Sequence, residues 1–182
     1  MTRHIEESIV SAGFGGQGIM VLGKVLANAG MESGLNVTYL PSYGAEVRGG
    51  TAHSVVRISS SHIGSPVVER YSAGVIMNEP SMEKFEPLIA AGGILIVNTS
   101  MVRTKAKRKD LHIIGAEITG LAMKLGNVKV ANMIAVGIYA ARKDIFTRQT
   151  LAGVIEKMAG ERKEIIPINI KAVDVGIEIG SQ

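Results

Sequence analysis

The sequence predicts an α/β fold with three layers, in which a mostly parallel β-sheet carries helices on both of its faces. Three observations predict this fold. Short apolar runs alternate along the chain with segments of helical periodicity, several of these runs are apolar throughout, and a glycine-rich turn joins the first run to the first helix. Residues 53–59 interrupt the alternation after a glycine-rich stretch. They are expected to form a hairpin-like insertion in the sheet.

The elements follow from the pattern in chain order. A first strand at residues 8–12 leads into a helix at 19–33, which Gly34 ends. Further strands are predicted at 36–40, 74–78, 93–98 and 111–114, and further helices at 81–91, 117–125, 128–142 and 147–159. The last segment fits two structures. Val173, Val175, Ile177 and Ile179 alternate as in a strand, whereas the pairs Val173/Ile177 and Ala172/Gly176 fit a helix.

Length and composition exclude several classes of protein. With 182 residues, the chain is expected to form one domain over residues 1–182. The absence of cysteine excludes disulfides, thiolate zinc sites, cysteine-bound iron–sulfur clusters and a cysteine nucleophile within this chain. The longest nearly apolar stretch, 131–141, contains Asn132 and is shorter than the roughly 18 residues that span a membrane. Without an apolar leader at the N-terminus, a cytoplasmic protein with no membrane partner is expected.

The positive charge of the chain is concentrated in one segment. Residues 103–110 contain five cations and one anion, which equals the net charge of +4 of the whole chain. No aromatic side chains alternate with these cations, so we expect no nucleic-acid partner. This basic run is either a solvated loop or a contact for an anionic ligand or an acidic partner.

The glycine-rich turn satisfies the pattern G-x-G-x-x-G at Gly13, Gly15 and Gly18, between a strand and a helix. Such a turn presents unpaired amides and the positive end of a helix dipole to an anion. Leu40 and Pro41 stand where a dinucleotide site needs an acidic residue, and Ile19 stands where a Walker A loop needs lysine. The glycines could also serve only the packing of strand, turn and helix.

A second constellation lies in residues 41–51, which contain Tyr43, Glu46 and Arg48. This segment leaves the carboxyl end of the second strand, beside the glycine turn, where open α/β sheets bind ligands. Arg48 suits two-pronged contact with a carboxylate or phosphate. Glu46 and Arg48 could equally pair with one another across a turn.

Other chemistry has no matching pattern. The four histidines, His4, His53, His62 and His112, have no spacing that forms a metal-binding face, and H-E-x-x-H is absent. The serine hydrolase elbow G-x-S-x-G is also absent. We therefore expect no metal site and no catalytic residue in this chain.

Five segments together resemble the gamma subunit of 2-oxoacid:ferredoxin (acceptor) oxidoreductases, over nearly the whole chain. They are residues 13–18, 41–51, 64–66, 78–81 and 130–133. The resemblance implies a Rossmann-like domain in a complex that converts pyruvate, 2-oxoglutarate or a branched 2-oxoacid and coenzyme A into acyl-CoA, CO2 and reduced ferredoxin. It also implies alpha and beta subunits as partners, with a ferredoxin-like delta subunit as a further candidate and ferredoxin as electron acceptor. Thiamine diphosphate, Mg and the iron–sulfur clusters would lie on those other subunits.

The resemblance also assigns residues to binding or docking. Those that match the family's two signatures are Gly13, Gly15, Gly16, Gln17 and Gly18, and Tyr43, Glu46, Arg48, Gly49 and Gly50. No cofactor is expected in the chain alone, but coenzyme A could lie at its surface. The helix start at Ile19, Arg48 and residues 103–109 are then candidates for its phosphates. The alternative is a free-standing nucleotide-binding α/β protein that uses the Gly13–Gly18 turn.

Overall fold

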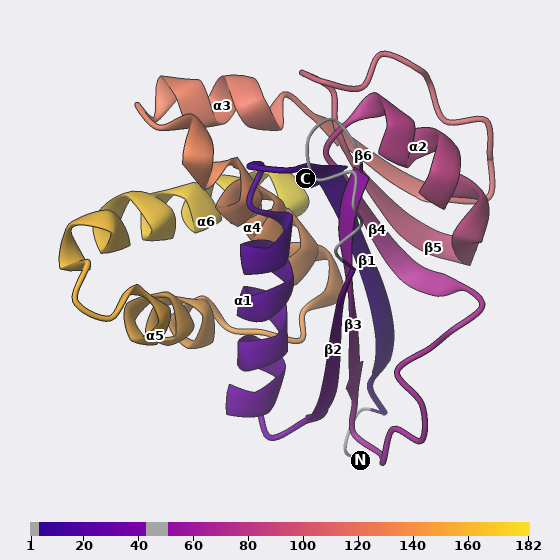
Figure 1. The fold of residues 1–182 in the computed structure, drawn as a ribbon, viewed down its shortest axis with the longest axis horizontal. Helices are drawn as coiled ribbons and strands as arrows, with labels where there is room; N and C mark the ends of the chain where they lie inside the picture. Colours follow the sequence, from indigo (N-terminus) through magenta and orange to yellow (C-terminus); the bar gives the residue numbers. More distant parts are fainter. Residues whose placement is uncertain (1–3, 43–50) are drawn as a thin grey trace.

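The computed structural model describes residues 4–42 and 51–182, which form a six-stranded sheet in the order β2-β3-β1-β4-β5-β6 (Figure 1). The pairs β1–β4, β4–β5 and β5–β6 are parallel, and β3 runs antiparallel to both β1 and β2. The strands are β1 (Glu6–Phe14), β2 (Asn36–Ser42), β3 (Thr51–Ser59), β4 (Tyr71–Ile76), β5 (Ile89–Asn98) and β6 (His112–Ala116). The mostly parallel sheet is confirmed, and the expected insertion is β3, which separates β1 from β2.

Helices cover both faces of this sheet, as predicted. On one side lie α1 (Ile19–Glu32) and α4 (Ala131–Lys143), with α5 (Arg148–Ala159) and α6 (Ile166–Gly180) packed outside them (Figure 1). On the other side lies α2 (Glu79–Phe85), and α3 (Ile118–Lys124) follows β6. Short 3-10 turns are η1 (Glu86–Leu88), η2 (Val128–Val130) and η3 (Lys163–Ile165).

The end of α1 forms as the sequence predicts. Gly34 adopts a φ of 74°, and its amide donates to the Met31 carbonyl while the Leu35 amide donates to the Gly30 carbonyl. This left-handed residue closes the last helical turn, a conformation that glycine adopts without the penalty of a Cβ atom.

The predicted helix at 81–91 is wrong in its second half. The helix ends at Phe85, η1 follows, and β5 already begins at Ile89. Pro87 lacks the amide that would continue the helical hydrogen bonds. Ile89 pairs with Tyr71 of β4, and the register then shifts before Ala73 pairs with Ile94, with Gly92 at a φ of 72° between them. The apolar start of β5 is thus decided by its partner strand.

The C-terminal segment is a helix, which settles the two alternatives that its sequence fits. In α6, Gly176 faces Gly137 of α4, and an added Cβ on either glycine would overlap a backbone carbonyl of the opposite helix. The two helices therefore pack backbone to backbone. This contact is available only to a helix with a small residue at that position.

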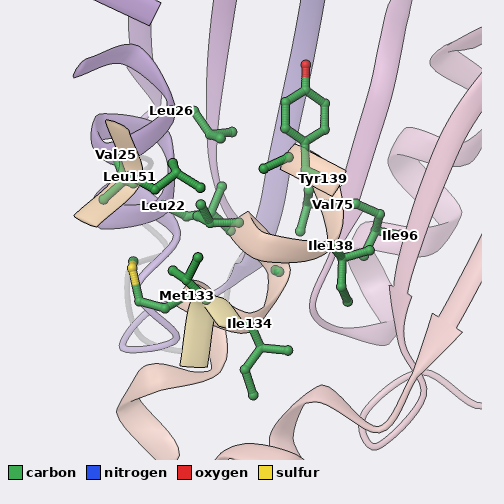
Figure 2. Close-up of a cluster of buried hydrophobic side chains, with 14 of the residues drawn as sticks. Leu22, Val25, Leu26, Val75, Ile96, Met133, Ile134, Ile138, Tyr139 and Leu151 are labelled. Carbon is green, nitrogen blue, oxygen red and sulfur yellow. The ribbon is translucent and has the colours of Figure 1, made fainter. Parts of the chain in front are cut away.

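The core has two parts, one on each face of the sheet. The larger lies under α1 and α4 and includes Leu22, Leu26, Val75, Ile96 and Ile138 (Figure 2). The smaller lies under α2 and includes Met82, Phe85 and Leu95. In the part of the chain that the structure describes, no helix is long and apolar enough to cross a membrane.

Candidate functional site

The candidate site lies at the carboxyl edge of the parallel strands. The glycine turn follows β1, Asn78 follows β4, and Asn98 is the last residue of β5. In open α/β sheets, ligands bind at this edge, next to the point where successive helices go to opposite faces. Here α1 and α2 lie on opposite faces, so that point lies between β1 and β4.

Three of the four glycines of the turn each have a structural reason. A Cβ on Gly13 would lie 2.5 Å from Gln17 Oε1 and 2.9 Å from the Met77 Cβ. Gly16 adopts a φ of 92° in the turn itself. Gly18 has a φ of 74° at the start of α1, and a Cβ there would overlap the side-chain amide of Asn132. Packing and backbone conformation thus account for these three positions.

The Gln17 side chain fills the space between the ends of β1 and β4. Its Oε1 accepts a hydrogen bond from the Phe14 amide at 2.6 Å, and its Nε2 donates to the Met77 carbonyl at 3.1 Å. In a dinucleotide fold, this crevice receives the pyrophosphate. The side chain of Gln17 therefore bridges the two strand ends that border this crevice.

Three buried asparagines surround this edge, and none of them is among the predicted site residues. Asn132 Nδ2 donates to the Gly18 carbonyl at 3.2 Å, and its buried Oδ1 has no hydrogen-bond partner. Asn98 Nδ2 donates to Thr119 Oγ1 at 2.8 Å, and its Oδ1 accepts from the Thr119 amide at 3.2 Å. Asn78 caps α2 by accepting from the Ser81 amide. The available signal was an amide side chain inside or next to an apolar run.

The start of α1 leaves its first amides without a side-chain cap. Gly18 makes no side-chain cap, and the first turn of α1 contains no acidic residue. Gly15 and Gly16, just before it, are exposed. Amides at such a helix start attract negative charge.

The second signature lies outside the described residues. Tyr43, Glu46, Arg48, Gly49 and Gly50 all fall in the undescribed segment, so the interpretations placed on them stay predictions. The residues that flank the segment are described. Ser42 pairs with His53, and Thr51 pairs with Phe14 at the end of β1. Both ends of the segment therefore lie at the same edge as the glycine turn.

The basic run is held to the α2 face by two carboxylates. Glu79 accepts hydrogen bonds from the Arg103 and Thr104 amides at 2.7 and 3.1 Å and from the Thr104 hydroxyl. Glu86, only 5% exposed, accepts from the Lys107 and Arg108 amides at 2.6 and 2.8 Å. The Thr104 hydroxyl bond, followed by the Arg103 amide bond, lowers the pKa of Glu79. The backbone of this run is thus ordered.

The side chains of the basic run divide into two groups. Arg108 pairs with Asp110 and also donates to the Ile89 carbonyl. The side chains of Arg103, Lys105, Lys107 and Lys109 are exposed, and no ion pair within the described ranges involves them. Arg103 and Lys105 border a cavity of about 590 Å³ whose wall includes Met82, Val97 and Ile113.

The described histidines do not form a metal site. Residues 4–42 and 51–182 contain no cluster of three metal-binding side chains. His53 instead packs its ring 5.1 Å from the ring of Phe85. Burial, and then the nearby charge of Lys84, lower its pKa, which is the behaviour of a packed neutral histidine.

Comparison with known proteins decides the family. The family model for pyruvate ferredoxin/flavodoxin oxidoreductase matches residues 8–179. The chain belongs to this family. Its match includes the glycine turn, all six strands from Ser8 onward and the helical second half.

Among curated relatives in the family, ketoisovalerate oxidoreductase subunit VorA of Methanothermobacter marburgensis is 32% identical over 182 residues. That alignment covers 95% of this chain and 36% of VorA, so the chain spans about a third of the length of this relative. The 2-oxoglutarate synthase subunit KorC of Archaeoglobus fulgidus is 31% identical over 176 residues, which are 96% of this chain and 88% of KorC.

Solved structures of the family share the fold. The gamma subunit of a keto/oxoacid ferredoxin oxidoreductase from Geobacter sulfurreducens is 25% identical, with a TM-score of 0.83 over 96% of this chain and 98% of that one. A 2-oxoglutarate:ferredoxin oxidoreductase from Magnetococcus marinus, solved with 2-oxoglutarate, coenzyme A and succinyl-CoA bound, is 23% identical. Its TM-score is 0.87 over 96% of this chain and 31% of that one, which shows a common fold.

Proposed function

We propose that this chain is the gamma subunit of a 2-oxoacid:ferredoxin oxidoreductase. The complex would oxidatively decarboxylate a 2-oxoacid with coenzyme A to acyl-CoA and CO2 and pass the electrons to ferredoxin. One observation carries this proposal. The chain matches 98% of the gamma subunit from Geobacter sulfurreducens with a TM-score of 0.83, and it covers about a third of VorA. A match over nearly the whole of a gamma subunit supports the same role for this chain.

The chemistry of this chain fits a subunit that binds and assembles. With no cysteine in its 182 residues, it supplies no thiolate to an iron–sulfur cluster. The iron–sulfur clusters would therefore belong to other subunits, the alpha, beta or delta subunit, and we place thiamine diphosphate and Mg there as well. The 2-oxoacid, whether 2-oxoglutarate, a branched 2-oxoacid or pyruvate, would be selected there as well.

The contribution to coenzyme A would come from the carboxyl edge of the sheet. Coenzyme A supplies the thiol that accepts the acyl group, and its phosphates need cations and amide donors. The uncapped start of α1 and the exposed turn at Gly15 and Gly16 suit one phosphate. Arg48 is the proposed cation, because the ends of its segment, at Ser42 and Thr51, lie at this edge.

The alternative of a free-standing dinucleotide-binding protein fits less well. The strand that would hold the ribose, β2, is separated from β1 by β3, a displacement of one strand or about 4.8 Å. Leu40 and Pro41 of β2 offer no carboxylate, and Gln17 fills the crevice between β1 and β4. Each difference removes one of the contacts that such a site needs.

Two measurements test the proposal. In the first, the isolated chain is titrated calorimetrically with NADH, ATP and coenzyme A and is assayed for turnover with NAD. Autonomous turnover with NAD would contradict the proposal. In the second, Arg48→Ala is placed in the assembled complex. We expect a KM for coenzyme A raised about tenfold or more, with the rate of 2-oxoacid decarboxylation nearly unchanged, as for a lost charge-assisted phosphate contact. Met31→Ala, an exposed substitution at the far end of α1, is the control.

A further inference from the structure

The strand at one edge of the sheet, β6, lacks the protection that such strands usually have. Its sequence, His112-Ile-Ile-Gly-Ala116, contains no proline and no charged lysine or glutamate, and its pairing with β5 has no bulge. Ile113 is 47% exposed, and His112 and Gly115 are exposed as well. Edge strands that remain in water are usually shortened, charged or bulged to prevent pairing with another chain. The outer side of β6 is therefore suited to pair with a strand of another chain.

The direction of the free hydrogen-bonding groups follows from the ladder. The Ala116 carbonyl accepts from the Thr99 amide, and the Asp110 carbonyl accepts from the Gly92 amide, so the even-numbered residues point toward β5. In a parallel ladder, consecutive residues alternate in direction. The N–H and C=O groups of Ile113 and Gly115 therefore point away from the sheet. They offer two donors and two acceptors to a further strand.

Hollows flank this edge. Ile113 and Gly115 line the 590 Å³ cavity on the α2 side, together with Arg103 and Lys105. A second hollow of about 450 Å³ is lined by Ile94, Ile114 and Arg142, and Ile113 borders both. Among the described elements, only β5 makes extensive contact with β6. Alternate side chains of an added strand would each find a recess on one face or the other.

The charge around this edge defines the chemistry of its occupant. The four exposed cations of the basic run, Arg103, Lys105, Lys107 and Lys109, directly precede β6, and Arg142 lines the second hollow. The acidic residue of the run, Asp110, already pairs with Arg108. Acidic side chains would therefore be attracted to the edge. A second copy of this chain would add a second run of charge +4, so it is the poorer fit.

We propose that the outer edge of β6 pairs with an extended, acidic segment of another subunit, which adds a seventh strand to this sheet. The inference rests on the proposed role of the chain as a subunit. It assigns the basic run to docking. The phosphates of coenzyme A are left to the glycine turn at the start of α1. Main-chain hydrogen bonds would give the affinity, and the cations and apolar hollows would give the selectivity.

Hydrogen exchange resolved to single amides tests the pairing. It compares the isolated chain with the complex assembled with its partner subunits. We expect the amides of Ile113 and Gly115 to exchange at least about tenfold more slowly in the complex than in the isolated chain, because each gains a hydrogen-bond acceptor. A complex that forms without this protection would overturn the edge pairing and leave the proposed function intact. If no complex forms, both proposals are wrong. Protection in the isolated chain, with a dimer in sedimentation, would identify a second copy as the occupant and contradict the proposal.

Substitutions test the edge and its charge separately. Ile113→Pro removes the outward amide donor without a change of charge, at a position where an edge strand tolerates proline. We expect it to compete with the wild-type chain for assembly at least about tenfold less well. Ile113→Ala, which keeps the amide, is the matched control, and circular dichroism checks that both variants fold. Lys105→Glu with Lys107→Glu and Lys109→Glu should slow association at low salt by about tenfold or more. An unchanged rate would show that the occupant is not acidic.

Discussion

The side chain of Gln17 joins the glycine turn to Met77, the residue that follows β4. Its Nε2 donates to the Met77 carbonyl at 3.1 Å, while its Oε1 accepts from the Phe14 amide at 2.6 Å. A glycine motif that is usually associated with a bound pyrophosphate is here closed by a side chain of the motif itself. This contact ties the glycine turn to the end of β4.

Removal of the two hydrogen bonds of the Gln17 side chain should destabilise the fold. In Gln17→Ala, the Phe14 amide loses its side-chain acceptor, and the Met77 carbonyl keeps only the longer hydrogen bond of 3.5 Å from Asn98 Nδ2. We expect a loss of about 1–3 kcal/mol in the free energy of unfolding. Gln17→Glu keeps the acceptor for Phe14 but places a second acceptor against the Met77 carbonyl, so it should restore only part of the loss. Urea denaturation measures both. Equal stability of Gln17→Ala and the wild type would show that these hydrogen bonds do not stabilise the fold.

Gly18 and Asn132 should behave as a coupled pair. Gly18→Ala puts a methyl group onto the Asn132 amide at a φ of 74°, so we expect a cost of about 2 kcal/mol or more. In Gly18→Ala with Asn132→Ala the overlap is gone, and the double variant should be less destabilised than the sum of the single ones. Gly16→Ala, whose Cβ would meet nothing within 4 Å, isolates the backbone strain of about 1–2 kcal/mol. If the free-energy changes of the two single variants simply add up in the double variant, the contact between Gly18 and Asn132 is contradicted.

The backbone contact of α4 with α6 predicts opposite effects for two glycine substitutions. Gly137→Ala would push the helices apart, because its methyl group overlaps the Val173 carbonyl, and we expect a loss of about 3 kcal/mol or more. Gly153→Ala in α5 meets no atom within 4 Å and should stabilise by about 0.5–1 kcal/mol through helix propensity. Thermal unfolding of the two variants checks the prediction. Similar melting temperatures would show that the close packing is absent in solution.

The anchor of the basic run should depend on pH. Because the hydrogen bonds from Thr104 and the Arg103 amide lower the pKa of Glu79 in the folded chain, its contribution is present above the ordinary value of 4.5 and is lost as the pH falls through the lowered pKa. Wild type should therefore be more stable than Glu79→Gln at pH 7, and the difference should shrink below pH 4.5. Melting temperatures across this range measure it, with the exposed Glu83→Gln as control. A difference that is constant with pH would contradict the anchor.

The sequence predicts the parts of the fold that depend on local pattern. The parallel strands, the stop at Gly34 and the inserted strand at 53–59 are confirmed because periodicity and turn residues specify them. The start of β5 could not be predicted, since Ile89 becomes a strand residue only through its pairing with Tyr71. The C-terminal helix likewise depends on a contact with Gly137.

The candidate site shows the same division. The glycine turn is recognisable as a motif, but the closure by Gln17 involves a carbonyl 60 residues away, and the contact between Asn132 and Gly18 spans 114 residues. The basic run was visible as charge, whereas its anchoring by Glu79 and Glu86 depends on how α2 lies over the sheet. Contacts between distant segments are not encoded in any local pattern.

Reconstitution of the oxidoreductase with and without this chain tests the central claim most directly. Ferredoxin reduction is measured with pyruvate, 2-oxoglutarate and branched 2-oxoacids in the presence of coenzyme A. The account predicts that the other subunits form the complete complex and reduce ferredoxin in a reaction dependent on coenzyme A only when this chain is present, and that the chain alone is inactive. Full activity of the remaining subunits without it, or NAD-dependent turnover by the chain alone, would contradict the account.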